Sequence, residues 1–119
     1  MIKFKRLLKS FKYALKGLKK TFHEEQNIRI QTFAGVVVLL AGGYFKIDRY
    51  DWVLLIFIIG LVILMELANS AVERVTDVLK PRISTYVKEI KDIMAAAVML
   101  ASFVAVIVGI IIFWPYLGF

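Results

Sequence analysis

The 119-residue chain contains no cysteine, only two prolines and a single histidine. The absence of cysteine excludes disulfide bonds and thiolate metal sites. No GxGxxG and no Walker-type glycine loop occurs, which excludes the common phosphate-binding loops. Acidic residues are absent from positions 1–20, and charged residues are absent from 52–65 and 93–114. These gaps divide the chain into a basic beginning and long uncharged segments.

Hydrophobic residues make up 61% of the chain, and the mean hydropathy is +0.77. This is too apolar for a soluble domain of this size, so we expect one all-α integral membrane domain over residues 1–119. The net charge of +7 indicates anionic lipid headgroups rather than nucleic acid as a partner, because the basic residues adjoin apolar segments. So small a chain cannot enclose a large polar site alone, and we expect it to form a homo-oligomer.

Residues 1–24 are expected to form an amphipathic helix on the membrane surface. Their apolar residues recur at spacings of three and four, as on one face of a helix. The cations between them are Lys3, Lys5, Arg6, Lys9, Lys12, Lys16, Lys19 and Lys20. Such a helix lies in the membrane interface with its basic face toward the headgroups. Thr21 and Glu24 have the spacing of a capping box, which predicts a new helix start there.

Three membrane-spanning helices are expected to follow, over residues 28–45, 52–79 and 93–114, with polar connections at 46–51 and 80–92. Small residues suit close helix contacts, and they occur at Gly35, Gly42, Gly43 and from Ala95 to Ala105. Residues 1–25 and 80–92 hold most of the cations. The positive-inside rule therefore predicts a multi-pass protein of the cell membrane, with these two segments in the cytoplasm and the carboxyl terminus outside.

A polar stretch that continues the second span carries the strongest candidate site. At about 100° per residue, its polar side chains lie within about 60° of Glu66 on one helix face. They are Glu66, Asn69, Ser70, Glu73 and Asp77. Glu73 and Asp77 could simply be solvated where the helix leaves the membrane, but Glu66 lies at least a turn deeper. A membrane carboxylate usually faces protein or water and often carries function. The stripe suits a cation site or a proton-transfer site.

Phosphoryl transfer is one chemistry that these residues could perform, since it needs neutralised phosphates and a positioned hydroxyl. Glu25 and Glu73 could supply the one or two carboxylates that Mg²⁺ takes besides phosphate oxygens. Lys91 and Arg6 could neutralise phosphate charge. Glu66 could take the proton from a lipid hydroxyl at the interface.

Other interpretations also fit parts of the pattern. Glu25 could be only the surface partner of Arg29, four residues further on. A small proton-coupled transporter would use a membrane carboxylate, but it usually needs the acid at mid-span. A structural or pore-forming subunit explains the basic beginning, but not the polar stripe.

We expect the active end to be cytoplasmic, where nucleotide and Mg²⁺ are available.

The stretch Glu66-Leu67-Ala68-Asn69-Ser70-Ala71-Val72-Glu73, followed by Asp77, resembles the E-x-x-N-[ST]-A-x-E…D signature of the prokaryotic diacylglycerol kinase family, which includes undecaprenol kinases. The resemblance covers nearly the whole chain, through Arg6, Tyr13, Glu25 and Lys91-Asp92 in order. It implies a surface helix and three membrane helices, assembled as a homotrimer with shared active sites. It also implies ATP- and Mg²⁺-dependent phosphorylation of a membrane lipid alcohol to its monophosphate.

The same resemblance implies the roles of individual residues. Glu66 matches the catalytic base, Glu25 and Glu73 match Mg²⁺ ligands, and Asn69 matches a residue that supports the site. The matching ATP-binding positions are Arg6, Tyr13, Glu25, Glu73, Asp77, Arg82, Ile83, Ser84, Lys91 and Asp92. The segment from Glu25 to Ile30 is similar to an E-x-N-x-x-I pattern of the Gram-positive branch, which favours a polyprenol such as undecaprenol over diacylglycerol as substrate.

Overall fold

Helices account for nearly all of the computed structural model, which describes residues 2–79 and 84–118. The four α-helices are α1 (Phe4–Glu24), α2 (Gln26–Phe45), α3 (Arg49–Leu79) and α4 (Ser84–Phe113). A short 3₁₀-helix, η1 (Trp114–Leu117), follows α4 directly. The described residues contain no β-strand. The prediction of an all-α fold is confirmed.

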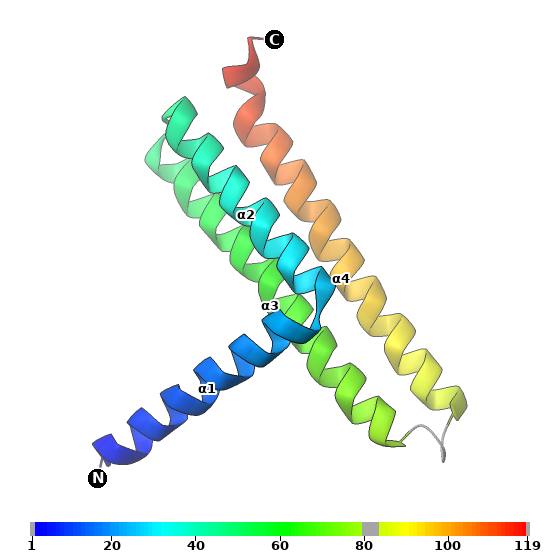
Figure 1. The fold of residues 1–119 in the computed structure, drawn as a ribbon. Coiled ribbons are helices and arrows are strands. Elements are labelled where there is room, and N and C mark those ends of the chain that lie inside the picture. The colour runs from blue at the N-terminus through cyan, green and yellow to red at the C-terminus, as the bar shows by residue number, and fades with distance from the viewer. Residues whose placement is uncertain (1, 80–83, 119) are drawn as a thin grey trace.

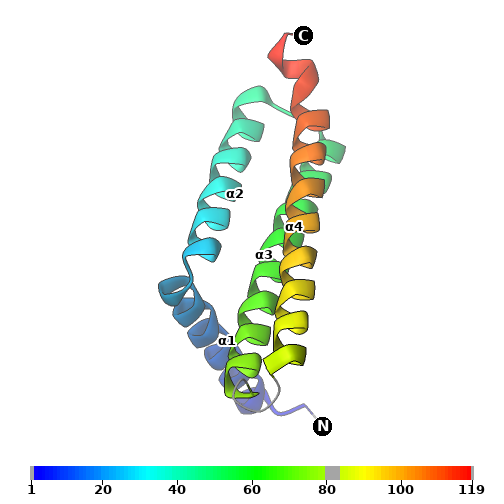
Figure 2. The same ribbon diagram turned by 90° about the vertical axis from the view of Figure 1, so that its right-hand side faces the viewer.

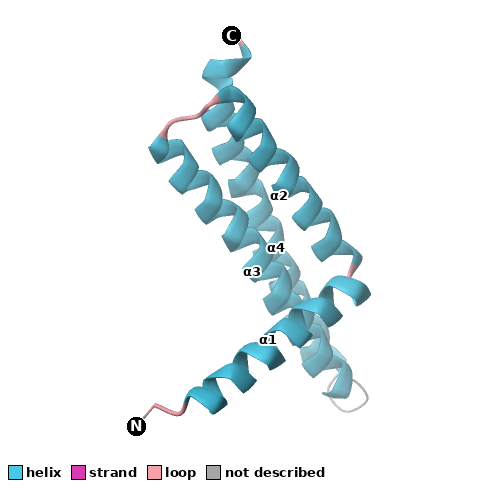
Figure 3. Ribbon diagram, turned by 60° about the vertical axis from the view of Figure 1, so that its left-hand side comes forward, coloured by secondary structure: helices cyan, strands magenta, loops and turns pink. Residues whose placement is uncertain are grey.

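The helices α2, α3 and α4 form a bundle, and α1 crosses the end of it at which α2 begins (Figure 1, Figure 3). In the turned view, α3 and α4 lie side by side along much of their length (Figure 2). Each of the three bundle helices is long and apolar enough to cross a membrane. The chain therefore has the three candidate spans that its uncharged segments predict, with a fourth helix set across them.

The length of α3 places its polar end beyond the apolar layer. Its 31 residues extend over about 46 Å at 1.5 Å per residue, whereas the hydrocarbon core of a bilayer is about 30 Å thick. The helix begins beside the short α2–α3 connection, and its uncharged residues run from Trp52 to Met65. The remaining part, from Glu66 to Leu79, therefore passes from the membrane into the interface.

The crossing helix α1 is amphipathic and contributes no buried residue. Its large apolar side chains are more than two-fifths exposed, among them Phe4, Leu8, Phe11 and Leu15. A soluble helix would bury such a face against protein, whereas an interfacial helix buries it at the boundary between headgroups and acyl chains. The arrangement fits the predicted position of α1 on the membrane surface.

The turn between α1 and α2 consists of one residue, Glu25, with an extended backbone at φ −107° and ψ 115°. Arg29 secures this elbow, because its Nη1 donates hydrogen bonds to the carbonyl oxygens of Phe22 (2.9 Å) and His23 (2.6 Å). Carbonyls in the last turn of a helix lack intrahelical partners, and a cation there also complements the helix dipole. Arg29 is thus a side-chain cap for α1.

Two sequence-based predictions fail at this elbow. The capping box is wrong, because α1 continues through Thr21, whose hydroxyl donates to the Gly17 carbonyl oxygen at 2.8 Å. The alternative in which Glu25 is the surface partner of Arg29 is also wrong. Arg29 reaches back to the end of α1 instead, which leaves the Glu25 carboxylate available to a different helix.

The predicted helix limits differ most in α4. This helix begins at Ser84, so the prediction of a polar connection over 80–92 is wrong for its residues from 84 onward. Lys and Glu are good helix formers, and Lys88 Nζ lies 3.0 Å from Asp92 Oδ2 in a pair one helical turn apart. At their amino-terminal ends, α2 and α3 each begin two or three residues earlier than expected.

Two of the three glycines in α2 allow close helix approach. A Cβ at Gly35 would lie 3.1 Å from Ile59, and a Cβ at Gly42 would lie 3.0 Å from the Trp52 ring. The prediction is confirmed for these two positions. A Cβ at Gly43 would meet nothing within 4 Å in the described residues, so the prediction is not supported there. On α4, one chain leaves Ala95 and Ala96 exposed, whereas Ala101 is buried.

Candidate active site

Glu66 lies where the three bundle helices meet. Its side chain is 6% exposed, and that of Ser70, one turn further along α3, is 4% exposed. Gln31 of α2 hydrogen-bonds the Glu66 carboxylate, and its Nε2 lies 3.5 Å from Ser102 Oγ of α4. The polar face of α3 is therefore turned into the protein at its deepest acid.

Glu25 reaches the same face from the elbow. Ser70 Oγ donates a hydrogen bond to Glu25 Oε1 at 3.1 Å, although the two residues are 45 positions apart. Glu25 is also near enough to Glu66 for their charges to interact. Because the extended backbone at Glu25 breaks the helix there, the carboxylate can turn toward α3 rather than follow the surface of α1.

Glu73 provides the third carboxylate of this group. Asn69 Nδ2 donates to Glu73 Oε1 at 3.4 Å, and the charge of Glu73 also interacts with that of Glu66. Thr76, which is 2% exposed, donates its hydroxyl to the Glu73 carbonyl oxygen at 3.0 Å. The structure thus brings together Glu25, Glu66 and Glu73, and two short polar side chains, Asn69 and Ser70, orient two of these carboxylates.

Asp77 lies at the exposed end of the stripe. Its side chain is 63% exposed, and its Oδ1 lies 2.9 Å from Nζ of Lys91 on α4. Asp92 follows Lys91 and pairs with Lys88. This part of the predicted nucleotide site is therefore a group of charges that joins α3 to α4 further along α3 than Glu66 and Glu73.

The remaining predicted nucleotide-binding positions lie elsewhere. Arg6 and Tyr13 are exposed on α1, about 27 Å and 17 Å along the helix axis from its last residue. Within the described part of the chain, the side-chain partners of the three carboxylates include Gln31 of α2 and Asn69, Ser70 and Arg74 of α3. Arg82 and Ile83 lie outside the described residues, and Ser84 is the first residue of α4.

Four residues near this site carry contacts that sequence reasoning did not assign: Glu24, Gln31, Arg74 and Thr76. Arg74 Nη2 lies 2.7 Å from Glu24 Oε2 and 4.0 Å from Glu25 Oε1, so it bridges α3 and the end of α1. Gln31 was detectable as a polar side chain inside an expected span. The contact between Arg74 and Glu24 had no such signal, because the two residues are 50 positions apart and meet only where the end of α1 reaches α3.

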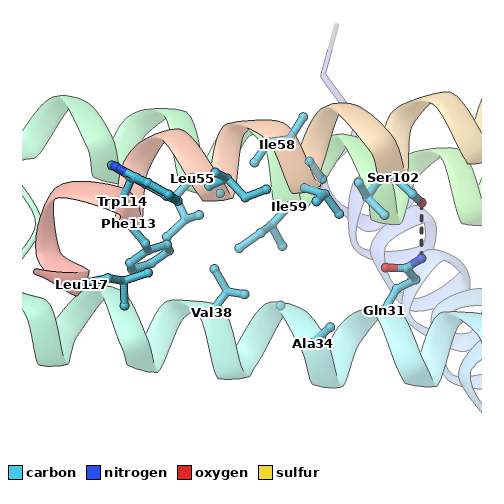
Figure 4. A pocket seen from close by; sticks show the side chains of 16 residues that line it. Gln31, Ala34, Val38, Leu55, Ile58, Ile59, Ser102, Phe113, Trp114 and Leu117 are labelled. Carbon is cyan, nitrogen blue, oxygen red and sulfur yellow. Dashed lines mark hydrogen bonds between the residues drawn. The ribbon is translucent and has the colours of Figure 1, made fainter. Parts of the chain in front are cut away.

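An apolar cavity of about 660 Å³ lies between α2, α3 and α4. Figure 4 shows the Gln31–Ser102 contact at one end, and Phe113, Trp114 and Leu117 at the other. A smaller cavity of about 290 Å³ lies under the end of α1, lined by residues such as Phe22, Ile63 and Leu67. Hydrocarbon is the chemistry that fits such walls. Both cavities come near Glu66, because its partner Gln31 lines the larger one and its sequence neighbour Leu67 lines the smaller one.

These features by themselves define a class of protein. A small all-α membrane protein holds a carboxylate group where its spans reach the interface, beside cavities that suit hydrocarbon. In the described ranges, no three His, Cys, Asp or Glu side chains are placed so that they could hold one metal ion together, so the three carboxylates are neighbours rather than a complete set of metal ligands. Such a site can handle a proton, and it can share a cation with an anionic ligand, at the polar end of a membrane lipid.

Similarity to known proteins makes the class specific. Residues 12–113 match the family model of prokaryotic diacylglycerol kinase, so the chain belongs to that family of lipid kinases. It is 30% identical over 112 residues to an undecaprenol kinase of Bacillus subtilis, covering 94% of this chain and 91% of that protein. It is 32% identical over 115 residues to a diacylglycerol kinase of Escherichia coli, covering 97% and 94%. With a diacylglycerol kinase of Synechocystis it shares 38% identity over 104 residues, covering 87% and 59%.

Proposed function

We propose that this lipid kinase transfers the terminal phosphoryl group of ATP to the hydroxyl of a membrane lipid alcohol, with Mg²⁺ as its metal ion. The observation that carries the proposal is the position of Glu66. Its carboxylate is buried, its partner Gln31 lines the apolar cavity, and its charge interacts with those of the more exposed acids Glu25 and Glu73. A lipid hydroxyl at the cavity mouth and a phosphate at the interface would meet there.

Glu66 is proposed as the general base. A base must lie within hydrogen-bonding reach of the proton that it removes, and Gln31 already hydrogen-bonds this carboxylate from α2. This amide restricts how the Glu66 carboxylate can turn. As the lipid oxygen attacks phosphorus, its proton passes to Glu66 and the bond to the leaving nucleoside diphosphate breaks.

The carboxylate group fits the proposed metal. Mg²⁺ prefers hard oxygen ligands and is usually held by one or two carboxylates together with substrate phosphates, so Glu25 and Glu73 suffice without a third protein ligand. When bound, the ion neutralises charge that develops on the phosphates. Ser70 and Asn69 hold the two carboxylates by hydrogen bonds of 3.1 Å and 3.4 Å, which limits how far either can turn away.

Nucleotide binding is proposed for the charges at the α3–α4 end, where Lys91 Nζ lies 2.9 Å from Asp77 Oδ1 and Asp92 follows Lys91. The family resemblance adds Arg82, Ile83 and Ser84 from the connection between these helices. It also adds Arg6 and Tyr13, which within one chain lie on α1 far from the end that adjoins the carboxylates. A homotrimer would resolve this distance, because the α1 helix of one copy could reach the carboxylates of another.

Uncovered surfaces on α4 support self-association. One chain leaves Ala95 and Ala96 exposed, and small residues of this kind let membrane helices approach closely. For orientation, we propose that α1 and the carboxylate end face the cytoplasm, because the basic segments lie there. The cations of α1 would then contact anionic headgroups of the inner leaflet.

For the acceptor lipid we propose undecaprenol rather than diacylglycerol. The pattern from Glu25 to Ile30 supports this choice, and the Bacillus subtilis relative is an undecaprenol kinase. The relatives from Escherichia coli and Synechocystis are diacylglycerol kinases. A proton-coupled transporter and a pore-forming subunit, the two alternatives from the sequence, do not fit a family of lipid kinases.

The test is a parallel phosphorylation assay. Purified protein in detergent micelles is incubated with Mg²⁺ and radiolabelled ATP, and with undecaprenol or diacylglycerol at equal mole fraction. We expect labelled lipid monophosphate with both, and a higher kcat/KM for undecaprenol. Equal or higher kcat/KM with diacylglycerol would contradict the acceptor assignment, and label transfer that persists after Mg²⁺ is removed with EDTA would contradict the metal.

A further inference from the structure

Arg74 is a cation beside the carboxylates to which neither the family resemblance nor the proposed mechanism gives a function. Its Nη2 lies 2.7 Å from Glu24 Oε2 and 4.0 Å from Glu25 Oε1. The side chains of Arg74 and Glu24 are 44% and 49% exposed. Exposed ion pairs contribute little stability, because water and salt screen them. The guanidinium can therefore exchange this carboxylate for another anion at little cost.

We propose that Arg74 binds phosphate oxygens of the nucleotide, and that Glu24 holds its guanidinium beside the site until the nucleotide arrives. The inference rests on the proposed function, in which Glu25 is a metal ligand. Phosphate oxygens that share an ion with Glu25 lie close to that carboxylate, since Mg²⁺–oxygen distances are about 2.0–2.1 Å. Arg74 is already 4.0 Å from Glu25 Oε1, so a small rotation brings its N–H groups to those oxygens.

The charges around the site support this assignment. A transferring phosphoryl group needs cations to neutralise it, and the planar guanidinium binds two phosphate oxygens at once. Lys91 is partly occupied by Asp77 at 2.9 Å, and Arg6 lies about 27 Å along α1 from Glu24. Arg74 is adjacent in sequence to Glu73 and in space to Glu25. Within one chain it is thus well placed to supply positive charge beside Glu25, one of the two proposed metal ligands.

A purely structural role for the same pair makes a different prediction. If Arg74 and Glu24 serve only to fasten α1 to α3, then removal of either partner breaks the same fastening and should have the same effect. If Glu24 instead competes with the nucleotide for Arg74, removal of Glu24 should free the guanidinium. Removal of Arg74 should then lower the affinity for the nucleotide, whereas removal of Glu24 should not lower it.

The experiment measures KM for ATP and kcat at saturating Mg²⁺ and lipid for Arg74→Met, Arg74→Lys and Glu24→Gln. Binding of a non-hydrolysable ATP analogue is measured alongside. We expect Arg74→Met to raise KM for ATP about tenfold or more, the range for a hydrogen bond between charged groups. Arg74→Lys, which keeps the charge but loses the fork, should raise KM less. Glu24→Gln frees the guanidinium, so KM for ATP should stay unchanged or fall by at most about fivefold relative to the wild type.

Matched controls are Arg49→Met and Asp51→Asn, both at the opposite end of α3, which make the same charge changes away from the site. Elution of the intact oligomer and the helical circular dichroism signal show that each variant is folded. A parallel rise in KM for Arg74→Met and Glu24→Gln would overturn the inference in favour of a fastening. An unchanged KM for Arg74→Met and Arg74→Lys would overturn it as well.

Two further arms of the experiment distinguish nucleotide binding by Arg74 from headgroup binding and from failure of the proposed function. Varying the fraction of anionic lipid at saturating ATP tests whether Arg74 binds headgroup phosphate instead. An Arg74→Met defect that follows anionic lipid, with KM for ATP unchanged, would overturn the inference. Wild-type protein that transfers no label from ATP to lipid would overturn the proposed function itself, a result that is distinct from any difference among the Arg74 and Glu24 variants.

Discussion

The Ser70 hydroxyl donates a 3.1 Å hydrogen bond to Glu25 Oε1, which joins the middle of α3 to the elbow between α1 and α2. Ser70 is itself buried. This contact fixes a carboxylate from a turn of the chain against a helix that spans the membrane. Glu25 therefore lies beside Ser70 and near Glu66, rather than standing as an isolated surface charge of α1.

Removal of the Ser70 hydroxyl should weaken the binding of Mg²⁺. In Ser70→Ala, Glu25 loses a partly buried hydrogen bond to its charged oxygen, and we expect the Mg²⁺ concentration for half-maximal activity to rise about tenfold. Activity at saturating Mg²⁺ should largely return. Ser10→Ala, which removes an exposed hydroxyl on α1, is the control. A lower kcat at saturating Mg²⁺ with an unchanged Mg²⁺ requirement would contradict the positioning of Glu25 by Ser70.

Replacing the proposed base should stop chemistry without stopping binding. Glu66→Gln keeps the size of the side chain and can still bond Gln31, but it cannot accept a proton at neutral pH. We expect kcat to fall at least about 10²-fold, the lower end of general-base contributions. The affinity for an ATP analogue should change little. Turnover above about a tenth of the wild-type value would exclude Glu66 as the base.

The two proposed metal ligands should not act independently. Glu25→Ala and Glu73→Ala should each weaken Mg²⁺-dependent nucleotide binding, because each removes a carboxylate from the same ion. The double variant should lose less binding free energy than the sum of the single losses, as expected for residues that share a partner. The measurement is titration of a fluorescent ATP analogue at several Mg²⁺ concentrations. Strict additivity would indicate that the two carboxylates do not hold one ion.

Whether an active site takes residues from two protomers can be tested with two residues that lie far apart within one chain. Arg6 lies about 27 Å along α1 from Glu24, whereas Glu66 belongs to the carboxylate group. Inactive Arg6→Met protein and inactive Glu66→Gln protein are mixed, dissociated and reassembled, and we expect activity to reappear. The control mixes Glu66→Gln protein with a protein that carries both substitutions, which offers no complete site. Properly mixed oligomers that stay inactive would show that each site is built within one protomer.

Helical periodicity predicted the site on α3 because every residue involved lies within three turns. Glu66, Ser70 and Glu73 needed only the helix repeat to fall on one face, and the structure turns this face inward. Contacts between helices had no comparable signal. The approach of Glu25 to Ser70 depends on a one-residue elbow, and the predicted capping box missed that elbow.

Arg29 and α4 show why local patterns give wrong predictions elsewhere in the chain. A Glu four residues before an Arg indicates a helical ion pair, but the helix is broken at Glu25, so Arg29 binds carbonyls of α1 instead. Polar residues from 84 onward indicated a loop, although Lys and Glu favour helix wherever a turn of paired charges can form. The polarity of a segment indicates whether it lies in the membrane or in water, but not whether it is a helix or a loop.

The cavity between α2, α3 and α4 has a kinetic consequence. Its walls belong to the membrane-spanning part of the protein, so an acceptor that occupies it would enter sideways from the bilayer rather than through water. The concentration that governs its occupancy is then the mole fraction of acceptor within the lipid phase, not its amount per volume of solution. Adding inert lipid at constant total acceptor would slow the reaction by two-dimensional dilution, even though nothing in the aqueous phase has changed.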